Sequence, residues 1–224
     1  MFQHASEPRR LSVVALLCCA FNGFATLLIL LGWLTNTNWL FQPISDAAPV
    51  VPVTAICILM STVSLFYLLL AKRTGRVDLL CVSRKWSLIA MAVAAITLLE
   101  YLFDLNVGLE TLLFHDRVVA FTPNVPYPGR LAPQTTLSFL VFSAGIYWMA
   151  RNTPQAMRDA GAVIAVGMII PGVALVGHFI NFPEFHTLAG LSQMSMAKPT
   201  AALLLILGAG ALALSDPQPY RGAR

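Results

Sequence analysis

The chain has 224 residues, of which 58% are hydrophobic and only 11% are charged, and its mean hydropathy is +0.75. Soluble domains carry about 25% charged residues, so this composition excludes an ordinary soluble domain and indicates an integral membrane protein. The net charge of +4 does not indicate a nucleic-acid partner, because most basic residues lie in short segments between apolar stretches.

Six apolar stretches without charged residues follow one another along the chain. About 20 apolar residues cross a bilayer core, so the first, second and fourth stretches are long enough by themselves. The third and fifth reach that length only if Glu100 and His178, which follow them, lie at or just inside a membrane face. We therefore predict an all-α integral membrane protein with six transmembrane helices. The stretches are 11–34, 47–71, 86–99, 131–150, 160–177 and 199–215.

The basic residues predict the orientation of these helices. If the N-terminus is cytoplasmic, eleven Lys and Arg residues fall on the inner side and only three, Arg117, Arg130 and Lys198, fall on the outer side. The positive-inside rule then predicts that both termini are cytoplasmic. The first stretch is long and no small-residue cleavage site ends it, so we interpret it as a helix and not as a signal peptide. The inner residues are Arg9, Arg10, Lys72, Arg73, Arg76, Arg84, Lys85, Arg151, Arg158, Arg221 and Arg224.

One phrase occurs three times, as PVVPVTAICIL at 49–59, LAPQTTLSFLV at 131–141 and MAKPTAALLLI at 196–206. In each copy a Pro stands one or two residues before a Thr and an apolar run follows. Pro suits the first turn of a helix and a Thr hydroxyl can satisfy a free backbone group, so we expect helix starts at which the Thr caps or packs. A role of these Thr residues in ligand binding stays open. The pairs are Pro52 and Thr54, Pro133 and Thr135, and Pro199 and Thr200.

This repeat predicts one membrane domain, 1–224, made of the three helix pairs 11–71, 86–150 and 160–215 and a short cytoplasmic tail, 216–224. Small residues recur in the second, fourth and sixth predicted helices. Such residues let helix backbones approach closely in lipid, so we expect these three helices at the centre and the bulkier odd helices around them. Pro171 and Gly172 interrupt the fifth predicted helix and should kink it.

The segments LLEYLFDLNVGLETLLF at 98–114 and PGRLAPQTTLSFLVFSAGIYW at 128–148 resemble the N-terminal multi-helix membrane region of bacterial sensor histidine kinases and diguanylate cyclases. The similarity is best over 98–148. It implies a sensory module in the bacterial cytoplasmic membrane that detects a signal at its periplasmic mouth and passes it to a cytoplasmic kinase or cyclase output domain. No such domain follows 215, so we expect either a piece of a longer receptor or a stand-alone relative.

Most groups able to do chemistry fall on the predicted outer side. Glu100 and His178 occupy matching places in the second and third repeats, and ionisable residues in membrane spans are functional candidates. We expect them to approach across the outer mouth with Arg130 nearby and to form a proton-linked switch. In the alternative reading, both lie at headgroup level and are satisfied by water.

The longest outer loop, 104–130, completes the candidate ligand-binding set with Asp104, His115 and Asp116. A loop of this length is typically functional or disordered, and its prolines stiffen it. We interpret it as a lid over the bundle.

A second hypothesis is a copper site, because thioether and imidazole groups suit that metal. The candidate ligands are His178, His186, Met194 and Met196. Met196 occupies the repeat position of Val50 and Leu131, which favours a packing role, so we predict no metal and identify no cofactor.

The sequence contains no nucleophile elbow, phosphate loop, HExxH or CxxC motif, so we predict no enzymatic activity. The alternatives to a sensor are a transporter or permease subunit and a structural subunit of a larger membrane complex. The expected partners are the lipid bilayer, an output domain or another membrane subunit, and a second copy of the chain.

Overall fold

The computed structural model describes residues 7–43, 48–122, 125–182 and 195–215. Over these residues the chain forms helices and turns without any β-strand, which confirms the all-α class. The helices are α1 (Glu7–Thr35), α2 (Asn38–Phe41), α3 (Pro52–Thr74), α4 (Asp78–Phe103), the 3-10 helix η1 (Leu109–Thr111), α5 (His115–Phe121), α6 (Pro133–Met149), α7 (Pro154–Gly167), α8 (Ile169–Phe179) and α9 (Lys198–Leu214).

Among the residues that the structure describes, four helical segments are long and apolar enough to cross a membrane. They are Ser12–Thr35 within α1, Pro52–Thr74, Asp78–Phe103, and Pro154–Phe179, which joins α7 and α8. Helices α6 and α9 have 17 residues each, somewhat fewer than the about 20 that cross a bilayer core. The four long apolar segments confirm the prediction of a membrane protein.

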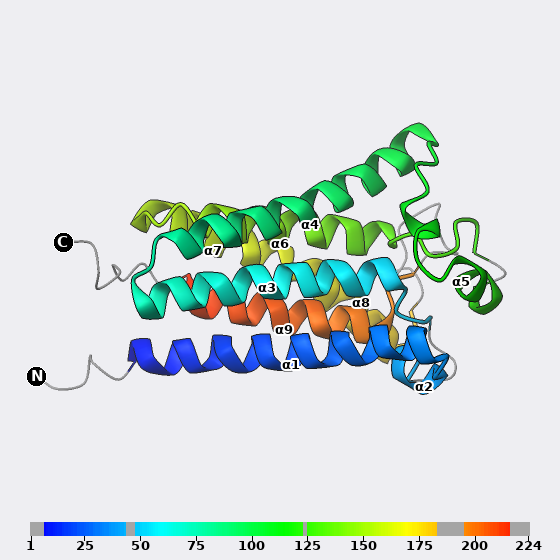
Figure 1. The fold of residues 1–224 in the computed structure, drawn as a ribbon, viewed down its shortest axis with the longest axis horizontal. Helices are drawn as coiled ribbons and strands as arrows, with labels where there is room; N and C mark the ends of the chain where they lie inside the picture. The colour runs from blue at the N-terminus through cyan, green and yellow to red at the C-terminus, as the bar shows by residue number, and fades with distance from the viewer. Residues whose placement is uncertain (1–6, 44–47, 123–124, 183–194, 216–224) are drawn as a thin grey trace, which may run out of the picture.

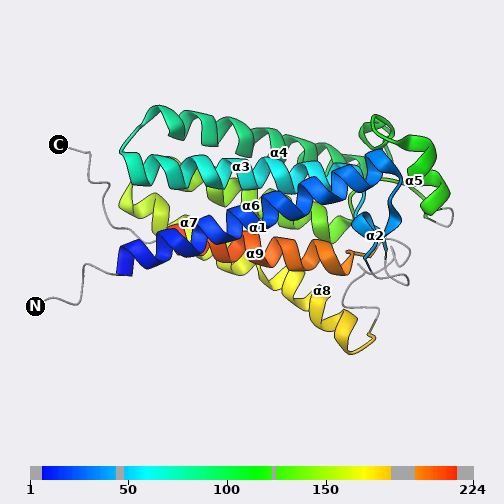
Figure 2. The same ribbon diagram turned by 60° about the horizontal axis from the view of Figure 1, so that its bottom comes forward.

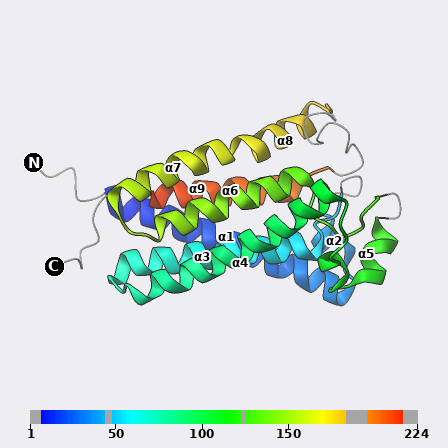
Figure 3. The same ribbon diagram turned by 90° about the horizontal axis from the view of Figure 1, so that it is seen from above.

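Helices α3, α6 and α9 form the centre of the bundle, where each packs against the other two. The remaining long helices surround them. Helix α1 packs on α3 and α9, α4 packs on α3 and α6, and α7 and α8 pack on α6 and α9. In Figure 3, α6 and α9 run between α7 and α8 on one side and α3 and α4 on the other. The second, fourth and sixth long helices thus make the inner contacts, as predicted.

The two ends of the bundle differ. Helix α1 begins and α9 ends at one end, on the left of Figure 1, which we call the terminal end. At the opposite end α3, α6 and α9 begin and the short helices α2 and α5 lie. We call this the mouth end. Figure 2 shows that α8 diverges from the bundle as it approaches the mouth end.

At the terminal end, basic side chains bind the carbonyl ends of two central helices. The guanidinium of Arg84 in α4 donates to the carbonyl of Ala150, which follows α6, from Nε at 3.1 Å and Nη2 at 2.6 Å. The ammonium of Lys72 in α3 donates to the carbonyl of Leu214 in α9. A cation at the C-terminus of a helix is favourable because the helix dipole is negative there.

The fifth long helix is interrupted between α7 and α8 at Met168. Pro171 follows three residues later and has no N–H, so the carbonyl of Gly167 loses the helical partner it would otherwise have. The bonds on either side continue, with the Met168 N–H donating to Ile164 at 2.9 Å and the Gly172 N–H to Met168 at 3.0 Å. The predicted break is present, shifted by three residues toward the N-terminus.

The surface of α1 shows why the bundle needs lipid. Leu17, Phe21, Phe24, Leu31 and Leu34 recur at helical spacing and are between 46% and 65% exposed. A contiguous apolar stripe of this kind is rare on soluble monomers. Hydrocarbon chains would cover it in a bilayer.

Candidate functional site

The three central helices begin where the repeated phrase stands. Helix α3 begins at Pro52, α6 at Pro133, and α9 at Lys198, one residue before Pro199. The preceding residues supply no side-chain cap; they are Val51, Ala132 and Ala197. In each helix the first main-chain hydrogen bond is donated by the N–H four residues after this preceding residue and accepted by its carbonyl. Ala55 donates to Val51, Thr136 to Ala132, and Ala201 to Ala197. The N–H groups before the donor remain unpaired, as at any uncapped helix start.

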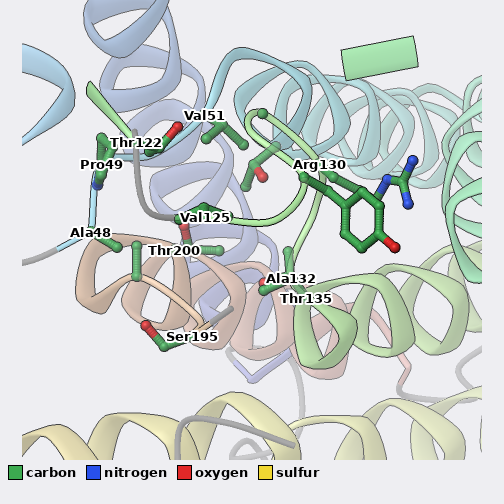
Figure 4. A pocket seen from close by; sticks show the side chains of 14 residues that line it. Ala48, Pro49, Val51, Thr122, Val125, Arg130, Ala132, Thr135, Ser195 and Thr200 are labelled. Carbon is green, nitrogen blue, oxygen red and sulfur yellow. The ribbon is translucent and has the colours of Figure 1, made fainter. Parts of the chain in front are cut away.

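These three helix starts meet around one cavity of about 80 Å³, which we call the mouth pocket. Thr54, Thr135 and Thr200 all line it, one from each central helix, and Figure 4 labels Thr135 and Thr200 among the lining side chains. The three residues are only 4%, 2% and 2% exposed. The mouth pocket thus brings together residues that are up to 146 positions apart in the sequence, from Thr54 to Thr200.

Of the two expected structural roles of these threonines, capping and packing, their burial fits packing. The hydroxyls of Thr54, Thr135 and Thr200 make no hydrogen bond to any described part of the chain, so no capping bond is present there. Their side chains face the cavity and leave the helix starts open. The alternative that the sequence left open, a role in ligand binding, has this geometric support.

The loop 104–130 covers part of the mouth pocket through Thr122, Val125, Tyr127 and Gly129. Gly129 has φ +86, and a Cβ there would lie 3.2 Å from the carbonyl oxygen of Glu110, so both conformation and space call for glycine. On its other side the loop is held by aromatic packing: the Phe121 ring lies edge-on to Trp33 at 5.9 Å and to Phe41 at 5.0 Å. The described part of this loop has the position expected of a lid.

Beside the mouth pocket lies a buried ion cluster of Glu100, Glu110 and Arg130. The Arg130 guanidinium donates to Oε1 of Glu110 from Nη2 at 2.9 Å and Nε at 3.2 Å. Its Nε also lies 3.5 Å from Oε2 of Glu100, an ion pair without a hydrogen bond. The side chains of Arg130 and Glu100 are 1% exposed, and that of Glu110 is 7% exposed. Two carboxylates and one guanidinium give this buried cluster a formal charge of −1.

Glu100 and Arg130 make further contacts with the main chain of the loop. Oε1 of Glu100 accepts the Val107 N–H at 2.8 Å, and Arg130 Nη2 lies 3.4 Å from the Leu105 carbonyl. In the described part of the chain, Nη1 of Arg130 and Oε2 of Glu100 have no hydrogen-bond partner. Because the stem of Arg130 lines the mouth pocket and its guanidinium extends away from the other labelled side chains (Figure 4), this residue joins the two parts of the site.

Two tyrosines hold Arg130 in place. The guanidinium carbon lies 4.2 Å from the ring centre of Tyr127 and 5.5 Å from that of Tyr101, within the range of cation–π attraction. The Tyr127 hydroxyl donates to Oδ1 of Asp104 at 2.9 Å. This hydrogen bond and the negative charge of the carboxylate raise the pKa of Tyr127.

Of the predicted ligand-binding set, the structure brings together Glu100 and Arg130, and Asp104 contacts their neighbour Tyr127. His115 and Asp116 lie exposed at the start of α5. Glu110, Tyr101 and Tyr127 were not predicted as site residues. Their spacing from Glu100 and Arg130 follows no helical or strand period, so the only available signal was an acidic residue in an otherwise apolar loop segment.

The structure does not bring His178 to Glu100. His178 lies on α8, where Nε2 is 2.7 Å from the Met196 carbonyl, and it lines a separate cavity of about 350 Å³ with Lys198 and Phe179. Helices α4 and α8 end on opposite sides of the bundle in Figure 2. The two residues match in the repeat, but α4 packs between α3 and α6 while α8 packs between α6 and α9. The expected Glu100–His178 switch is therefore not formed.

The copper hypothesis falls partly outside the described residues, where His186 and Met194 lie. Met196 is fully buried and contributes its main-chain carbonyl to His178. Among the residues that the structure describes, no group of three or more His, Cys, Asp or Glu side chains could hold a metal ion.

Comparisons with protein-family models, with curated proteins and with solved structures return no match.

Proposed function

We propose that the chain is a six-span protein of the bacterial cytoplasmic membrane with both termini inside, built from three repeated helix pairs. The arrangement around the centre supports the repeats, because each of α1, α4 and α7–α8 packs between two central helices. Helices of 17 residues suit the centre, since ends that lie inside the protein need not reach a lipid headgroup. The basic residues of 72–85 and Arg151 lie at the terminal end, which supports a cytoplasmic location for that end.

The function that the geometry supports best is that of a sensory module that binds a small ligand in the mouth pocket and passes the signal along the central helices. The observation that carries this proposal is the convergence of Thr54, Thr135 and Thr200 on one cavity. Because the walls of the mouth pocket are the starts of α3, α6 and α9, a ligand that draws these starts together would change how the three helices pack. Helix α9 extends that change to the terminal end, where Lys72 holds the Leu214 carbonyl.

The same geometry disfavours a transporter. Further along the central helices their interface is filled by buried apolar side chains, among them Leu65, Phe139 and Leu204, each 0% exposed. Apolar cores packed in this way leave no space for a ligand to continue through the bundle.

The experiment uses the full chain in lipid nanodiscs, with thermal unfolding measured against a library of small amines, alcohols, sugars, carboxylates, phosphates and metal salts. We expect at least one compound to raise the Tm of the wild type and to change the distance between spin labels at Thr74→Cys and Ser215→Cys at the terminal end. Binding without any change in the label distance would refute the sensory role. Uptake of the bound compound into proteoliposomes would favour a transporter instead.

A further inference from the structure

We propose that the mouth pocket binds an oxyanion: a small free carboxylate, phosphate or sulfate, or the same group at the end of a larger molecule. This inference rests on the proposed ligand-binding function and adds the chemical class of the ligand. It follows from the donors, the charges and the size of the cavity.

Three helix starts supply the first set of donors. Each central helix has Pro in its first turn, which leaves two unpaired N–H groups before the first main-chain bond. Each start also carries a partial positive charge from the helix dipole, and helix N-termini bind anions for these reasons. Convergence of three starts on one cavity adds their dipoles. Of the residues with unpaired N–H groups, Thr54, Thr135 and Thr200 line the mouth pocket, one from each helix start.

The three threonine hydroxyls are an independent second observation. Thr54, Thr135 and Thr200 are more than nine-tenths buried, line the cavity, and have no hydrogen-bond partner in the described residues. Their hydroxyl oxygens are not among the fully enclosed side-chain atoms that lack a partner, so they open onto the cavity, where a group that accepts hydrogen bonds can pair with them. That group must accept hydrogen bonds from hydroxyl and N–H donors at once.

The charges around the mouth pocket favour a negative group. Arg130 is the only charged residue among the described side chains that line it, and no acidic side chain does so. The carboxylates of Glu100 and Glu110 bind the guanidinium of Arg130, which in Figure 4 extends away from the cavity. Because the cluster as a whole has a formal charge of −1, the preference for a negative group comes from the three positive helix ends, which no carboxylate in the described lining compensates.

The size of the cavity limits the occupant. Its volume of about 80 Å³ is roughly half that of the ~150 Å³ cavity that accommodates benzene. A group of four or five non-hydrogen atoms, such as acetate, phosphate or sulfate, is therefore the largest that the enclosed part can take. A longer ligand would have to extend through the open side.

The test measures thermal unfolding of the full chain in phosphatidylcholine nanodiscs. Sodium phosphate, sulfate and acetate are compared with sodium chloride at equal ionic strength. Acetate is also compared with acetamide, which has the same size without the charge, and with methylammonium, a smaller cation. A second arm adds anionic phospholipid to the nanodiscs, which distinguishes a lipid headgroup from a free ion. We expect at least one oxyanion source to raise the Tm while acetamide and methylammonium do not.

Variants locate the effect. Thr54→Val, Thr135→Val and Thr200→Val should each weaken the apparent affinity by about tenfold, the loss expected for one hydrogen bond to a charged group. Thr→Ser at the same positions should retain it. Thr62→Val is the matched control, because Thr62 is also in α3, is also 4% exposed and also lacks a hydrogen-bond partner in the described residues, but does not line the mouth pocket.

Each outcome separates the two proposals. Stabilisation by acetamide or methylammonium that the Thr→Val variants abolish would overturn the oxyanion inference and leave the ligand-binding function standing. Stabilisation by oxyanions that the Thr→Val variants leave unchanged would move the site away from the mouth pocket. No response to any compound, here or in the wider library, would refute both. If a Val variant fails to fold, the Ser variant and the two remaining single variants still provide the comparison.

Discussion

Arg130 is the residue on which the two halves of the site depend. Its stem lines the mouth pocket, and its guanidinium pairs with Glu110 and Glu100. Charges that are this deeply buried are stable only when they are paired, because the cost of leaving water is otherwise not recovered. The pairing should therefore be visible in the stability of single variants.

Replacing Arg130 with Met should lower the free energy of unfolding by about 3 to 5 kcal/mol, because it leaves two buried carboxylates without their cation. Denaturant unfolding in detergent micelles measures this. Arg76→Met is the control, since Arg76 pairs with Asp78 at the surface, where both side chains are at least 60% exposed, and its loss should change little. Equal effects of the two variants would mean that the buried cluster is not formed.

The two carboxylates of the cluster should respond differently to neutralisation. Glu110→Gln removes the charge that accepts two guanidinium hydrogen bonds, so we expect a clear loss of stability. Glu100→Gln keeps an oxygen for the Val107 N–H and removes the excess negative charge, so its cost should be smaller. The same unfolding assay compares them, and a larger loss for Glu100→Gln would contradict the observed geometry.

Tyr127 gives the site a dependence on alkaline pH. Its pKa is raised in the folded state by the hydrogen bond to Asp104, so folding favours the protonated phenol. The resulting stability is fully present below the unfolded pKa of about 10 and is lost as the pH rises through the higher folded pKa. We expect the Tm to fall above about pH 10 and Tyr127→Phe to reduce that fall. A Tm profile that is identical in both proteins would exclude this contact.

At the scale of elements, the central helices combine open starts with close packing along their length. The small residues near their crossings let neighbouring helices approach: a Cβ at Gly145 would lie 2.6 Å from Cγ1 of Ile164 in α7, and one at Gly208 would lie 2.6 Å from Cγ of Met168. Such contacts fix the rotation of each helix. The rotation in turn decides that Thr54, Thr135 and Thr200 point to the same cavity.

Gly167→Ala tests this packing between α6 and α7. The added Cβ would lie 2.5 Å from Cγ1 of Val141, and the branched Val side chain has little freedom to move. We expect the free energy of unfolding to fall by about 1 to 3 kcal/mol. Gly23→Ala in α1 is the control, because nothing lies within 4 Å of its Cβ position, and it should be neutral or slightly stabilising. Equal effects of the two variants on the free energy of unfolding would contradict the close contact between Gly167 and Val141.

At the scale of the whole molecule, orientation in the membrane determines what the mouth pocket can sense. With the mouth end outside, the pocket samples the periplasm and the basic terminal end faces the cytoplasm. The exposed stripe of α1 gives the bundle its lipid contact but does not distinguish one direction from the other.

Cysteine accessibility tests the orientation. After replacement of Cys18, Cys19, Cys57 and Cys81, single cysteines are introduced at Leu112, which is 73% exposed, and at Thr74 near the terminal end. A membrane-impermeant maleimide should label Leu112→Cys in spheroplasts and Thr74→Cys only after the membrane is opened. The reverse pattern would invert the proposed topology and put the mouth pocket in the cytoplasm.

Much of the architecture could be predicted from local properties of the sequence. Composition indicates the membrane, Pro52, Pro133 and Pro199 mark helix starts, and small residues indicate the central helices. Glu100 and Arg130 were recognised as candidates because charges in apolar surroundings are costly. These inferences depend only on helix propensity and on the free energy of transfer from water to lipid, and both are properties of the individual residue.

Which side chains contact one another was decided by the tertiary structure. Equivalent repeat positions suggested Glu100 with His178, but α4 and α8 pack on different sides of α6, and Glu100 pairs with Arg130, which also binds Glu110. The three threonines were expected to cap or pack at their own helix starts, and the packing of the helices brings all three to one cavity. Helix rotation and the path of the loop 104–130 decide these contacts, because both are set by packing among distant segments. By itself, the sequence determined which residues are costly to bury and where helices begin; only the packing of those helices decided which residues meet.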